Sequence, residues 1–240
     1  MLYLIGLGLD RKDISLRALE AIKKCKNVYL DVYTNIFHYK ISDIEKSIGR
    51  KIIKAERALI EESDEIIKSA KKKDAALLVS GDPLAATTHI DLMLRAKKEK
   101  IPVRIIHAPS IFTAVSETGL QLYKFGKTAS IPKWYESFKP ESFLDIIENN
   151  LKIKAHTLVL IDIGMSVNEA LNQLSDAGRK RNVRLKEIIV CERIGTDEGR
   201  ISRGAIEKLM IKKFRLPACI IIPAELHFIE DESLRLFKKD

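Results

Sequence analysis

The segment most suggestive of ligand chemistry is a turn with two glycines, residues 6–10 (GLGLD), which directly follows the apolar run at residues 2–5. Because glycine has no Cβ, a ligand or another backbone can approach such a turn closely. Asp31, about 20 residues further on, is the acidic residue that would hold a ribose in a dinucleotide-binding fingerprint. Arg11 occupies the position of the third glycine, however. Three interpretations stay open: a plain tight turn, a nicotinamide site, or a loop that faces another nucleotide-like ligand.

A second small-residue segment, residues 80–89 (SGDPLAATTH), follows the apolar run at residues 75–79. Gly81, Asp82 and Pro83 favour a turn, because glycine adopts unusual torsions and proline fixes the backbone. One interpretation is therefore a turn followed by a helix that a threonine caps. The other is a ligand pocket, because open α/β sheets bind ligands at the carboxyl ends of their strands, where this segment and the glycine turn would both lie.

A third segment, residues 107–113 (HAPSIFT), also follows a predicted strand. Ser110 suits the position just before a helix, because its hydroxyl can accept a hydrogen bond from a free backbone N–H. The same residue can contact a ligand, since the start of a helix presents N–H groups toward polar ligand atoms. The two roles are compatible.

Motifs of several other enzyme classes are missing from the chain. It has no Gly-x-Ser-x-Gly nucleophile turn, no phosphate-binding Gly-x4-Gly-Lys-Ser/Thr loop and no His-Glu-x-x-His zinc motif. Cys25, Cys191 and Cys219 are widely spaced inside apolar runs, which predicts buried, reduced thiols rather than disulfides or a metal site. The five histidines show no metal-ligand spacing. Hydrolase chemistry therefore has no support, and no metal is expected.

The 240 residues carry a formal net charge of +9, which raises the question of a polyanionic partner. The basic residues are dispersed, and their short runs fall near predicted helix ends, where cations complement the helix dipole. With 6% aromatic residues and no basic stripe, direct nucleic-acid binding is not expected. The first apolar run meets Asp10 too early for a signal peptide, and no run approaches the roughly 20 apolar residues of a membrane span. We therefore expect a cytoplasmic protein without a membrane partner.

Short apolar runs alternate along the chain with longer segments of helical period, which is typical of strands and helices in an α/β fold. In the first half this pattern predicts a parallel sheet whose strands are buried on both faces. Its predicted strands are residues 2–5, 28–32, 75–79 and 103–106. The three small-residue segments would then lie at the carboxyl ends of strands.

The same alternation begins again after residues 108–110, with predicted strands at residues 157–163, 188–191 and 219–222. One helix is expected to carry Pro140 in its first turn, a position that proline favours. Another is expected to begin at the capping box formed by Ser166 and Glu169. The sequence therefore predicts two α/β domains, residues 1–109 and residues 110–240.

Four stretches together resemble the diphthine synthase family of the tetrapyrrole methylase superfamily, and the likeness spans nearly the whole chain. They are residues 6–34 (GLGLDRKDISLRALEAIKKCKNVYLDVYT), 81–89 (GDPLAATTH), 108–132 (APSIFTAVSETGLQLYKFGKTASIP) and 156–163 (HTLVLIDI). The most specific part is TGLQLYKFGKTASIP, because the wider superfamily shares the glycine-rich opening but not this segment.

The resemblance implies an activity and a partner as well as a fold. It implies two α/β domains of tetrapyrrole methylase type with S-adenosylmethionine in the cleft between them, usually in a homodimer. The implied reaction is N-methylation of the 3-amino-3-carboxypropyl-histidine of translation elongation factor 2, which forms diphthine in diphthamide biosynthesis. S-adenosylhomocysteine would be the second product. The alternative is methylation of a corrin or porphyrin precursor by a member of the same superfamily.

The resemblance also implies cofactor contacts when the family's contact positions are matched to this sequence one by one. Several of the matched positions are apolar, which suits contacts through the backbone or by packing. The implied contacts are Leu9, Asp82, Ala85, Ser110, Ile111, Ile161, Ile194 and Cys219. Relatives commonly have histidine in place of Cys219 and glycine in place of Ala224. A thiol has less hydrogen-bonding capacity than imidazole, so a backbone contact is expected at Cys219. No residue is assigned as the catalytic base.

Overall fold

A computed structural model describes residues 1–237, and the contacts of the chain divide it into two units, Met1–Phe112 and Thr113–Asp240. The division lies three residues after the boundary predicted from the sequence. Helix α5 (Ile111–Ala114) spans it. In the part of the chain that is described, no helix is long and apolar enough to cross a membrane.

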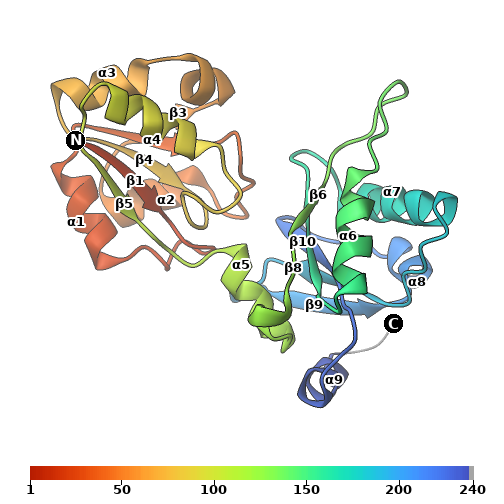
Figure 1. Cartoon of the computed structure of the whole chain (residues 1–240). Helices are drawn as coiled ribbons and strands as arrows, with labels where there is room; N and C mark the ends of the chain where they lie inside the picture. The colour runs from red at the N-terminus through yellow and green to blue at the C-terminus, as the bar shows by residue number, and fades with distance from the viewer. Residues whose placement is uncertain (238–240) are drawn as a thin grey trace. The chain divides into compact units, whose positions relative to one another are not determined.

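Unit 1 contains a five-stranded sheet in which every neighbouring pair is parallel, in the order β3-β2-β4-β1-β5 (Figure 1). The strands are β1 (Leu2–Gly6), β2 (Asn27–Asp31), β3 (Ile53–Ala55), β4 (Ala75–Val79) and β5 (Val103–Ile106). The central strands β1 and β4 are buried along their whole length. The parallel sheet predicted from the first half is confirmed, with β3 as an additional edge strand that the sequence did not reveal.

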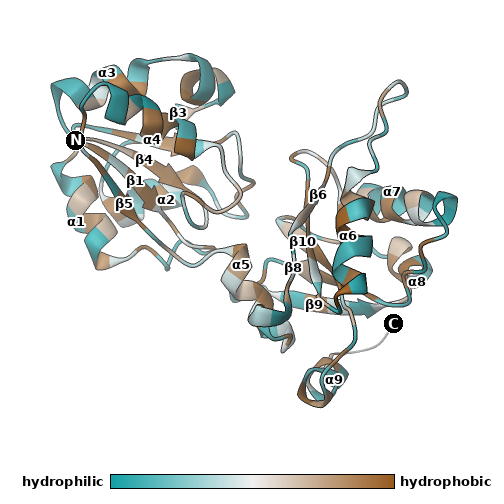
Figure 2. Cartoon of the chain, in the orientation of Figure 1, coloured by the Kyte–Doolittle hydropathy of each residue, from teal (hydrophilic) through white to brown (hydrophobic). Residues whose placement is uncertain are grey.

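Helices cover both faces of this sheet. Successive side chains along a strand point to opposite faces, so strands that are apolar throughout present apolar side chains on both faces. The helices of the unit are α1 (Leu16–Lys24), α2 (Ile41–Ile48), the π-helical turn η1 (Ala58–Glu62), α3 (Glu65–Lys72) and α4 (His89–Lys98). On one face Leu4 and Leu77 belong to the same apolar cluster as residues of α3 and α4. On the other face Ile5 and Leu78 share a cluster with residues of α1 and α2. Figure 2 shows the central strands in the brown of hydrophobic residues, as burial on both faces requires.

Unit 2 contains a second five-stranded sheet, in the order β6-β7-β10-β8-β9. The strands are β6 (Ala129–Ile131), β7 (Thr157–Ile161), β8 (Ile188–Glu192), β9 (Arg200–Gly204) and β10 (Ala218–Ile222). Only the β6–β7 pair is parallel, and the other three pairs are antiparallel. The sequence predicted a parallel sheet for the first half alone, and the antiparallel pairs of this second sheet include β8 and β9, which have no helix between them.

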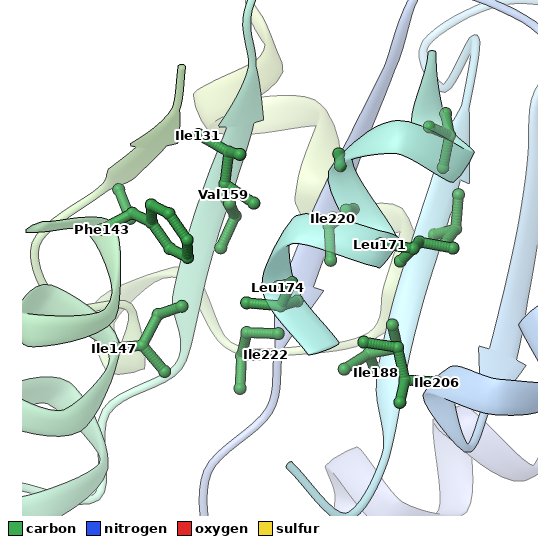
Figure 3. Packing of buried hydrophobic residues seen from close by; sticks show 14 of the residues in the cluster. Ile131, Phe143, Ile147, Val159, Leu171, Leu174, Ile188, Ile206, Ile220 and Ile222 are labelled. Atoms are coloured by element: carbon green, nitrogen blue, oxygen red, sulfur yellow. The ribbon is translucent and has the colours of Figure 1, made fainter. Parts of the chain in front are cut away.

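The core of unit 2 lies between one face of this sheet and three helices, α6 (Ser142–Lys152), α7 (Val167–Lys180) and α8 (Ile206–Met210). Figure 3 shows Phe143, Leu171 and Ile206 of these helices directed at the isoleucines and valines of the strands. The unit also contains the short 3-10 helices η2 (Val115–Thr118) and η3 (Leu122–Lys124), and α9 (Phe228–Arg235).

The predicted helix starts had mixed outcomes. The capping box at α7 is confirmed, because Ser166 Oγ accepts a hydrogen bond from Glu169 N (3.2 Å) and Glu169 Oε2 accepts one from Ser166 N (2.7 Å). Pro140 does not lie in the first turn of α6, which begins at Ser142. The carbonyl oxygen of Pro140 instead accepts a hydrogen bond from the indole of Trp134 (2.9 Å).

Candidate functional site

Three loops meet at one edge of the sheet in unit 1, residues 7–13, 80–88 and 107–110. They follow β1, β4 and β5, which are neighbours and run in the same direction. Because the carboxyl ends of parallel strands lie at the same edge of a sheet, the loops come together there, as predicted. Figure 1 shows the three strand ends side by side.

Glycines at the end of β1 and in the first two loops allow these segments to touch. A Cβ on Gly6 would lie 2.6 Å from the carbonyl oxygen of Gly81 and 2.8 Å from Ala108 Cβ, so only glycine fits. Gly8 and Gly81 also exchange backbone hydrogen bonds, with N···O distances of 3.3 and 2.7 Å. The close approach that the sequence predicted at Gly6 is thus an approach of neighbouring backbone.

Asp13 fixes the shape of the first loop. Its Oδ2 accepts hydrogen bonds from the backbone N–H groups of Leu9 and Asp10, both at 2.9 Å. Gly8 has a φ of +78°, a left-handed conformation that glycine adopts without strain. This role of Asp13 was not predicted from the sequence. The available signal is its residue type, because aspartate side chains in turns accept hydrogen bonds from nearby backbone N–H groups.

Asp82 joins the second loop to the third. Its Oδ1 accepts a hydrogen bond from Leu84 N (3.0 Å), and its Oδ2 lies 2.7 Å from His107 Nδ1 and 3.3 Å from Ala108 N. The Asp82 side chain is 14% exposed, whereas that of His107 is 70% exposed. The Asp82 carboxylate therefore orients the loop that carries Ser110. His107 was not assigned this role from the sequence.

Asp31 does not have the role that a dinucleotide site would give it. It is fully buried, and its carboxylate accepts hydrogen bonds from the N–H groups of Tyr33 (2.8 Å) and Thr34 (3.0 Å). Nε2 of the buried His89 lies 3.2 Å from Asp31 Oδ2, while His89 Nδ1 donates to the carbonyl oxygen of Pro83 (3.0 Å). Because these groups already occupy the carboxylate, it is not available to a ribose.

The electrostatics of Asp31 favour its ionised form. Burial alone favours the neutral acid, but the His89 imidazole, the Thr34 hydroxyl and two backbone N–H groups outweigh it and lower the Asp31 pKa. The helix that follows the second loop begins after Thr88, as expected, but the Thr88 side chain makes no capping hydrogen bond. His89, the first residue of that helix, instead ties the loop to the end of β2.

The remaining predicted contacts of unit 1 lie in or beside these loops. Ala85 donates its N–H to the carbonyl oxygen of Asp82 (3.1 Å) and closes a turn. Ser110 is buried, and the absent Cβ of Gly81 would lie 3.7 Å from Ser110 Cβ. Ile111 is the first residue of α5. The structure therefore gathers the predicted contacts of unit 1 at one edge of its sheet.

In unit 2 the predicted contacts also lie at one end of a sheet. Ile161 is the last residue of β7, and Cys219 near the start of β10 pairs with its neighbour Leu160. On its other side Cys219 pairs with Cys191 of β8, and Ile194 follows the end of β8. The antiparallel pairing of β10 with both strands brings these three positions together.

Cys219 and Cys191 are both buried free thiols, as the sequence predicted. The hydrogen bond with Cys219, together with burial, raises the Cys191 pKa well above its ordinary value, so Cys191 is a neutral thiol. The Cys219 side chain is therefore engaged inside the sheet. A contact of Cys219 with a ligand is consequently expected from the backbone.

Two residues in the left-handed region lie directly beside predicted contacts. Ala86 has a φ of +56° and follows Ala85, and Arg193 has a φ of +45° and precedes Ile194. Neither residue ends a helix. Strained backbone of this kind occurs preferentially at functional sites, so each of the two loops is a candidate functional element of its own unit.

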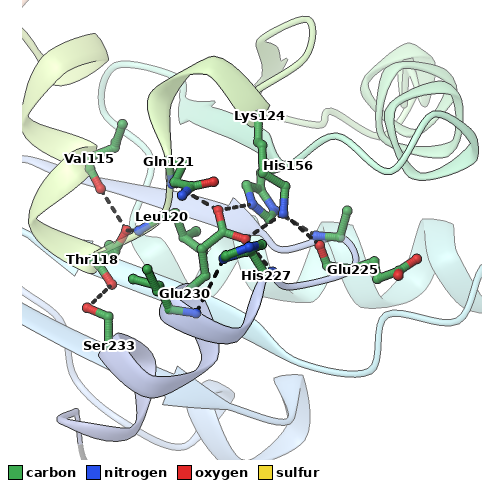
Figure 4. Close-up of polar contacts among 12 residues, drawn as sticks. Val115, Thr118, Leu120, Gln121, Lys124, His156, Glu225, His227, Glu230 and Ser233 are labelled. Carbon is green, nitrogen blue, oxygen red and sulfur yellow. Dashed lines mark hydrogen bonds and ion pairs between the residues drawn. The ribbon is translucent and has the colours of Figure 1, made fainter.

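A separate buried polar network lies in unit 2, outside the candidate site (Figure 4). Glu230 of α9 accepts hydrogen bonds from Gln121 N (2.9 Å), His227 N (2.8 Å) and the ammonium of Lys124. His156 Nδ1 accepts a hydrogen bond from Ala224 N (2.9 Å), so its proton is on Nε2, which donates to Glu230 Oε1 (3.1 Å). The network joins η3, α9 and the residue that precedes β7.

Burial and hydrogen bonding act differently on the two titratable groups of this network. Burial lowers the His156 pKa, because it disfavours the charged imidazolium. For Glu230, burial would raise the pKa, but Lys124, the two backbone N–H groups and His156 together lower it to about 2. Glu230 is therefore ionised at all pH values near neutrality.

No group of three or more His, Cys, Asp or Glu side chains among residues 1–237 is arranged to hold a metal ion. The three loops of unit 1 instead present small and apolar residues, backbone N–H groups and the Asp82 carboxylate. None of the eight predicted contacts is lysine or arginine.

Comparisons with known proteins identify the family of the chain. The family model Tetrapyrrole (Corrin/Porphyrin) Methylases matches residues 1–210. A diphthine methyl ester synthase of Homo sapiens is 40% identical over 99% of this chain and 95% of its own length, and a diphthine synthase of Methanococcus maripaludis is 39% identical over 98% of both. The solved structure of a diphthine synthase has a TM-score of 0.91 at 34% identity and covers 100% of this chain and 97% of its own. The chain belongs to the tetrapyrrole methylase family, among the diphthine synthases, and is a methyltransferase.

Proposed function

We propose that the chain transfers methyl groups from S-adenosylmethionine to the amino nitrogen of the 3-amino-3-carboxypropyl-histidine of translation elongation factor 2, forming diphthine and S-adenosylhomocysteine. The observation that carries this proposal is similarity over nearly the full length to diphthine synthases of both eukaryotes and archaea. Methylation of a corrin or porphyrin precursor rests only on the name of the wider family.

We also propose that the cofactor contacts Leu9, Asp82, Ala85, Ser110, Ile111, Ile161, Ile194 and Cys219. Hydrogen bonds among the three loops of unit 1 support the first five, since they fix these residues before any ligand arrives. The strained backbone at Ala86 and Arg193 supports Ala85 and Ile194. Apolar side chains in the set suit packing on the adenine and methionine moieties, and backbone groups suit their polar atoms.

Bound S-adenosylmethionine supplies a methyl group on a sulfonium, which is a good leaving group. The task of the protein is then to hold the acceptor nitrogen, the methyl carbon and the sulfur in line, and such positioning can supply several kcal/mol of the barrier. An alkyl amine is mostly protonated at neutral pH, so a partly desolvated site that favours the neutral amine would also raise the rate. The rigid loops around Asp13 and Asp82 are suited to the positioning role.

The proposal extends to assembly and compartment. We propose a homodimer, supported by exposed apolar side chains of η3 and α9, two elements that the contact between Lys124 and Glu230 joins. These side chains are Leu122, Tyr123, Phe228 and Ile229. Exposed apolar groups of this kind are typical of subunit contacts. Sedimentation equilibrium tests the assembly, and a single species of monomer mass would contradict it. Because translation elongation takes place in the cytoplasm, we propose that compartment for the enzyme.

Substrate choice distinguishes the proposed function from the alternative. With isotope-labelled S-adenosylmethionine, we expect transfer of label to elongation factor 2 that carries the aminocarboxypropyl group and none to uroporphyrinogen. Elongation factor 2 with an unmodified histidine is the control, and it should stay unlabelled because the acceptor nitrogen is missing. Label in uroporphyrinogen alone would favour the corrin and porphyrin alternative.

A further inference from the structure

Residues 133–140, between β6 and α6, form an arm that extends from the body of unit 2 (Figure 1). Two side chains fix the base of this arm. The buried Gln173 of α7 accepts a hydrogen bond from Trp134 N (3.0 Å) and donates one to the carbonyl oxygen of Pro132 (2.8 Å). The Trp134 indole donates to the carbonyl oxygen of Pro140 (2.9 Å) and closes the arm. Its base is therefore held in one conformation.

The tip of the arm is a short antiparallel turn that presents two aromatic side chains. Tyr135 and Phe138 exchange both backbone hydrogen bonds, with N···O distances of 3.0 and 3.1 Å. Residues paired in this way direct their side chains to the same face of the turn. Their exposed fractions are 63% and 61%. Aromatic residues are enriched at protein interfaces, and this pair is both exposed and held by its backbone pairing.

The base of the arm is connected to the candidate site. Asp162 follows Ile161, a proposed cofactor contact, and its N–H donates to the carbonyl oxygen of Ile131 (3.2 Å). Asp162 Oδ2 accepts a hydrogen bond from Lys133 N, the first residue of the arm (3.1 Å). Ile131 is also paired with Ile161 in the sheet. The arm therefore starts one strand away from a proposed cofactor contact.

We propose that the arm docks the protein substrate beside the site of methyl transfer, with Tyr135 and Phe138 packing on the surface around the modified histidine. This inference rests on the proposed function. An extended element with an exposed aromatic pair suits a folded protein as acceptor, because the surface of such a protein continues around the modified residue. The arm then contributes to substrate affinity and leaves the cofactor contacts unchanged.

The test is steady-state kinetics of the double variant Y135A/F138A with elongation factor 2 that carries the aminocarboxypropyl group. We expect KM for this protein to rise roughly tenfold to hundredfold, the range that truncation of interface aromatics produces, with kcat nearly unchanged. The Kd for S-adenosylmethionine, measured by calorimetry, should not change. A short peptide that contains the modified histidine should be methylated equally by both enzymes, because it does not reach the arm.

Two matched controls isolate the aromatic contribution. Tyr135→Phe keeps the ring and should retain the normal KM. Ile211→Ala removes an apolar side chain that is 86% exposed but lies outside the arm, and it should also retain the normal KM. An unchanged KM for Y135A/F138A would overturn the proposal, as would a rise accompanied by loss of the dimer, which would make the arm a subunit contact. If the unaltered enzyme methylates no elongation factor 2, the proposed function itself fails, and the two failures are thus distinguishable.

Discussion

Replacing Gly8 by alanine is expected to reduce methyl transfer by roughly 100-fold, because displacement of about 1 Å in a positioning element can have an effect of this size. A Cβ at this position would lie 2.1 Å from Asp13 Cβ and 2.7 Å from Asp13 Oδ2. Asp13 would have to move, and the N–H groups of Leu9 and Asp10 would lose their acceptor. The measurement is the Kd for S-adenosylmethionine by calorimetry together with the rate of methyl transfer.

Gly49→Ala is the matched control, because Gly49 also has a positive φ, +64°, but no atom within 4 Å of the position of its Cβ. Both variants lose about 1–2 kcal/mol of stability from the left-handed conformation of a non-glycine residue. Only Gly8→Ala also forces Asp13 away from residue 8 and so distorts the loop of residues 7–13. Equal cofactor affinity in the two variants would show that the geometry of the 7–13 loop does not matter for binding.

The second large effect is expected from Glu230→Ala, which should lower the free energy of unfolding of unit 2 by about 3–5 kcal/mol. Loss of one partner from a buried ion pair has this effect, because the other groups are left uncompensated. Here the His156 Nε2–H and two backbone N–H groups would lose their acceptor, and the Lys124 ammonium would keep only the carbonyl oxygen of Glu225. Trp134 is the single tryptophan of the chain and lies in unit 2, so its fluorescence during urea unfolding follows this unit.

Glu225→Ala is the control, since Glu225 also pairs with a lysine, Lys154, at 2.7 Å, but both side chains are about two-thirds exposed. Exposed ion pairs contribute only about 0–1 kcal/mol. If Glu230→Ala costs no more than Glu225→Ala, the buried network does not stabilise unit 2.

The same network predicts that stability falls with acid. In the unfolded chain Glu230 binds a proton below about pH 4.3, whereas in the folded protein it does so only near pH 2. The stability that ionised Glu230 contributes is therefore present above pH 4.3 and is lost as the pH falls from about 4.3 to about 2. The lowered His156 pKa acts in the same direction from about pH 6.5 downward. The difference between Glu230→Ala and the unaltered protein should therefore shrink between about pH 4 and pH 2.

Local pattern predicted unit 1 better than unit 2. Continuous apolar runs such as β1 and β4 are easily recognised, because strands buried on both faces need them. The edge strand β9 carries arginine, serine and glycine, and β6 has three residues, so neither has a recognisable apolar pattern. Antiparallel pairing in unit 2 depends on contacts between distant segments, which local periodicity does not report.

The candidate site shows the same limit. Gly6 and Gly8 attract attention in the sequence because they lack a Cβ at the end of a predicted strand, and Asp82 because it belongs to a Gly-Asp-Pro turn after another strand. That Asp82 holds His107, and that Asp13 holds Leu9 N, depends on three loops from distant parts of the chain meeting at one edge. Asp31 illustrates the converse, since its spacing fits a ribose contact but its carboxylate is fully buried. The identities of the acceptor and cofactor come from family resemblance and not from local chemistry.

The central claim is tested most directly by mass spectrometry of elongation factor 2 carrying the aminocarboxypropyl-histidine, after incubation with this enzyme and S-adenosylmethionine. The account predicts successive mass increments of one methyl group each, localised by fragmentation to that histidine and absent without cofactor. Mild alkali distinguishes N-methyl groups, which persist, from a methyl ester, which is hydrolysed. An unchanged mass of the histidine, with cofactor binding shown by calorimetry in the same preparation, would contradict the account.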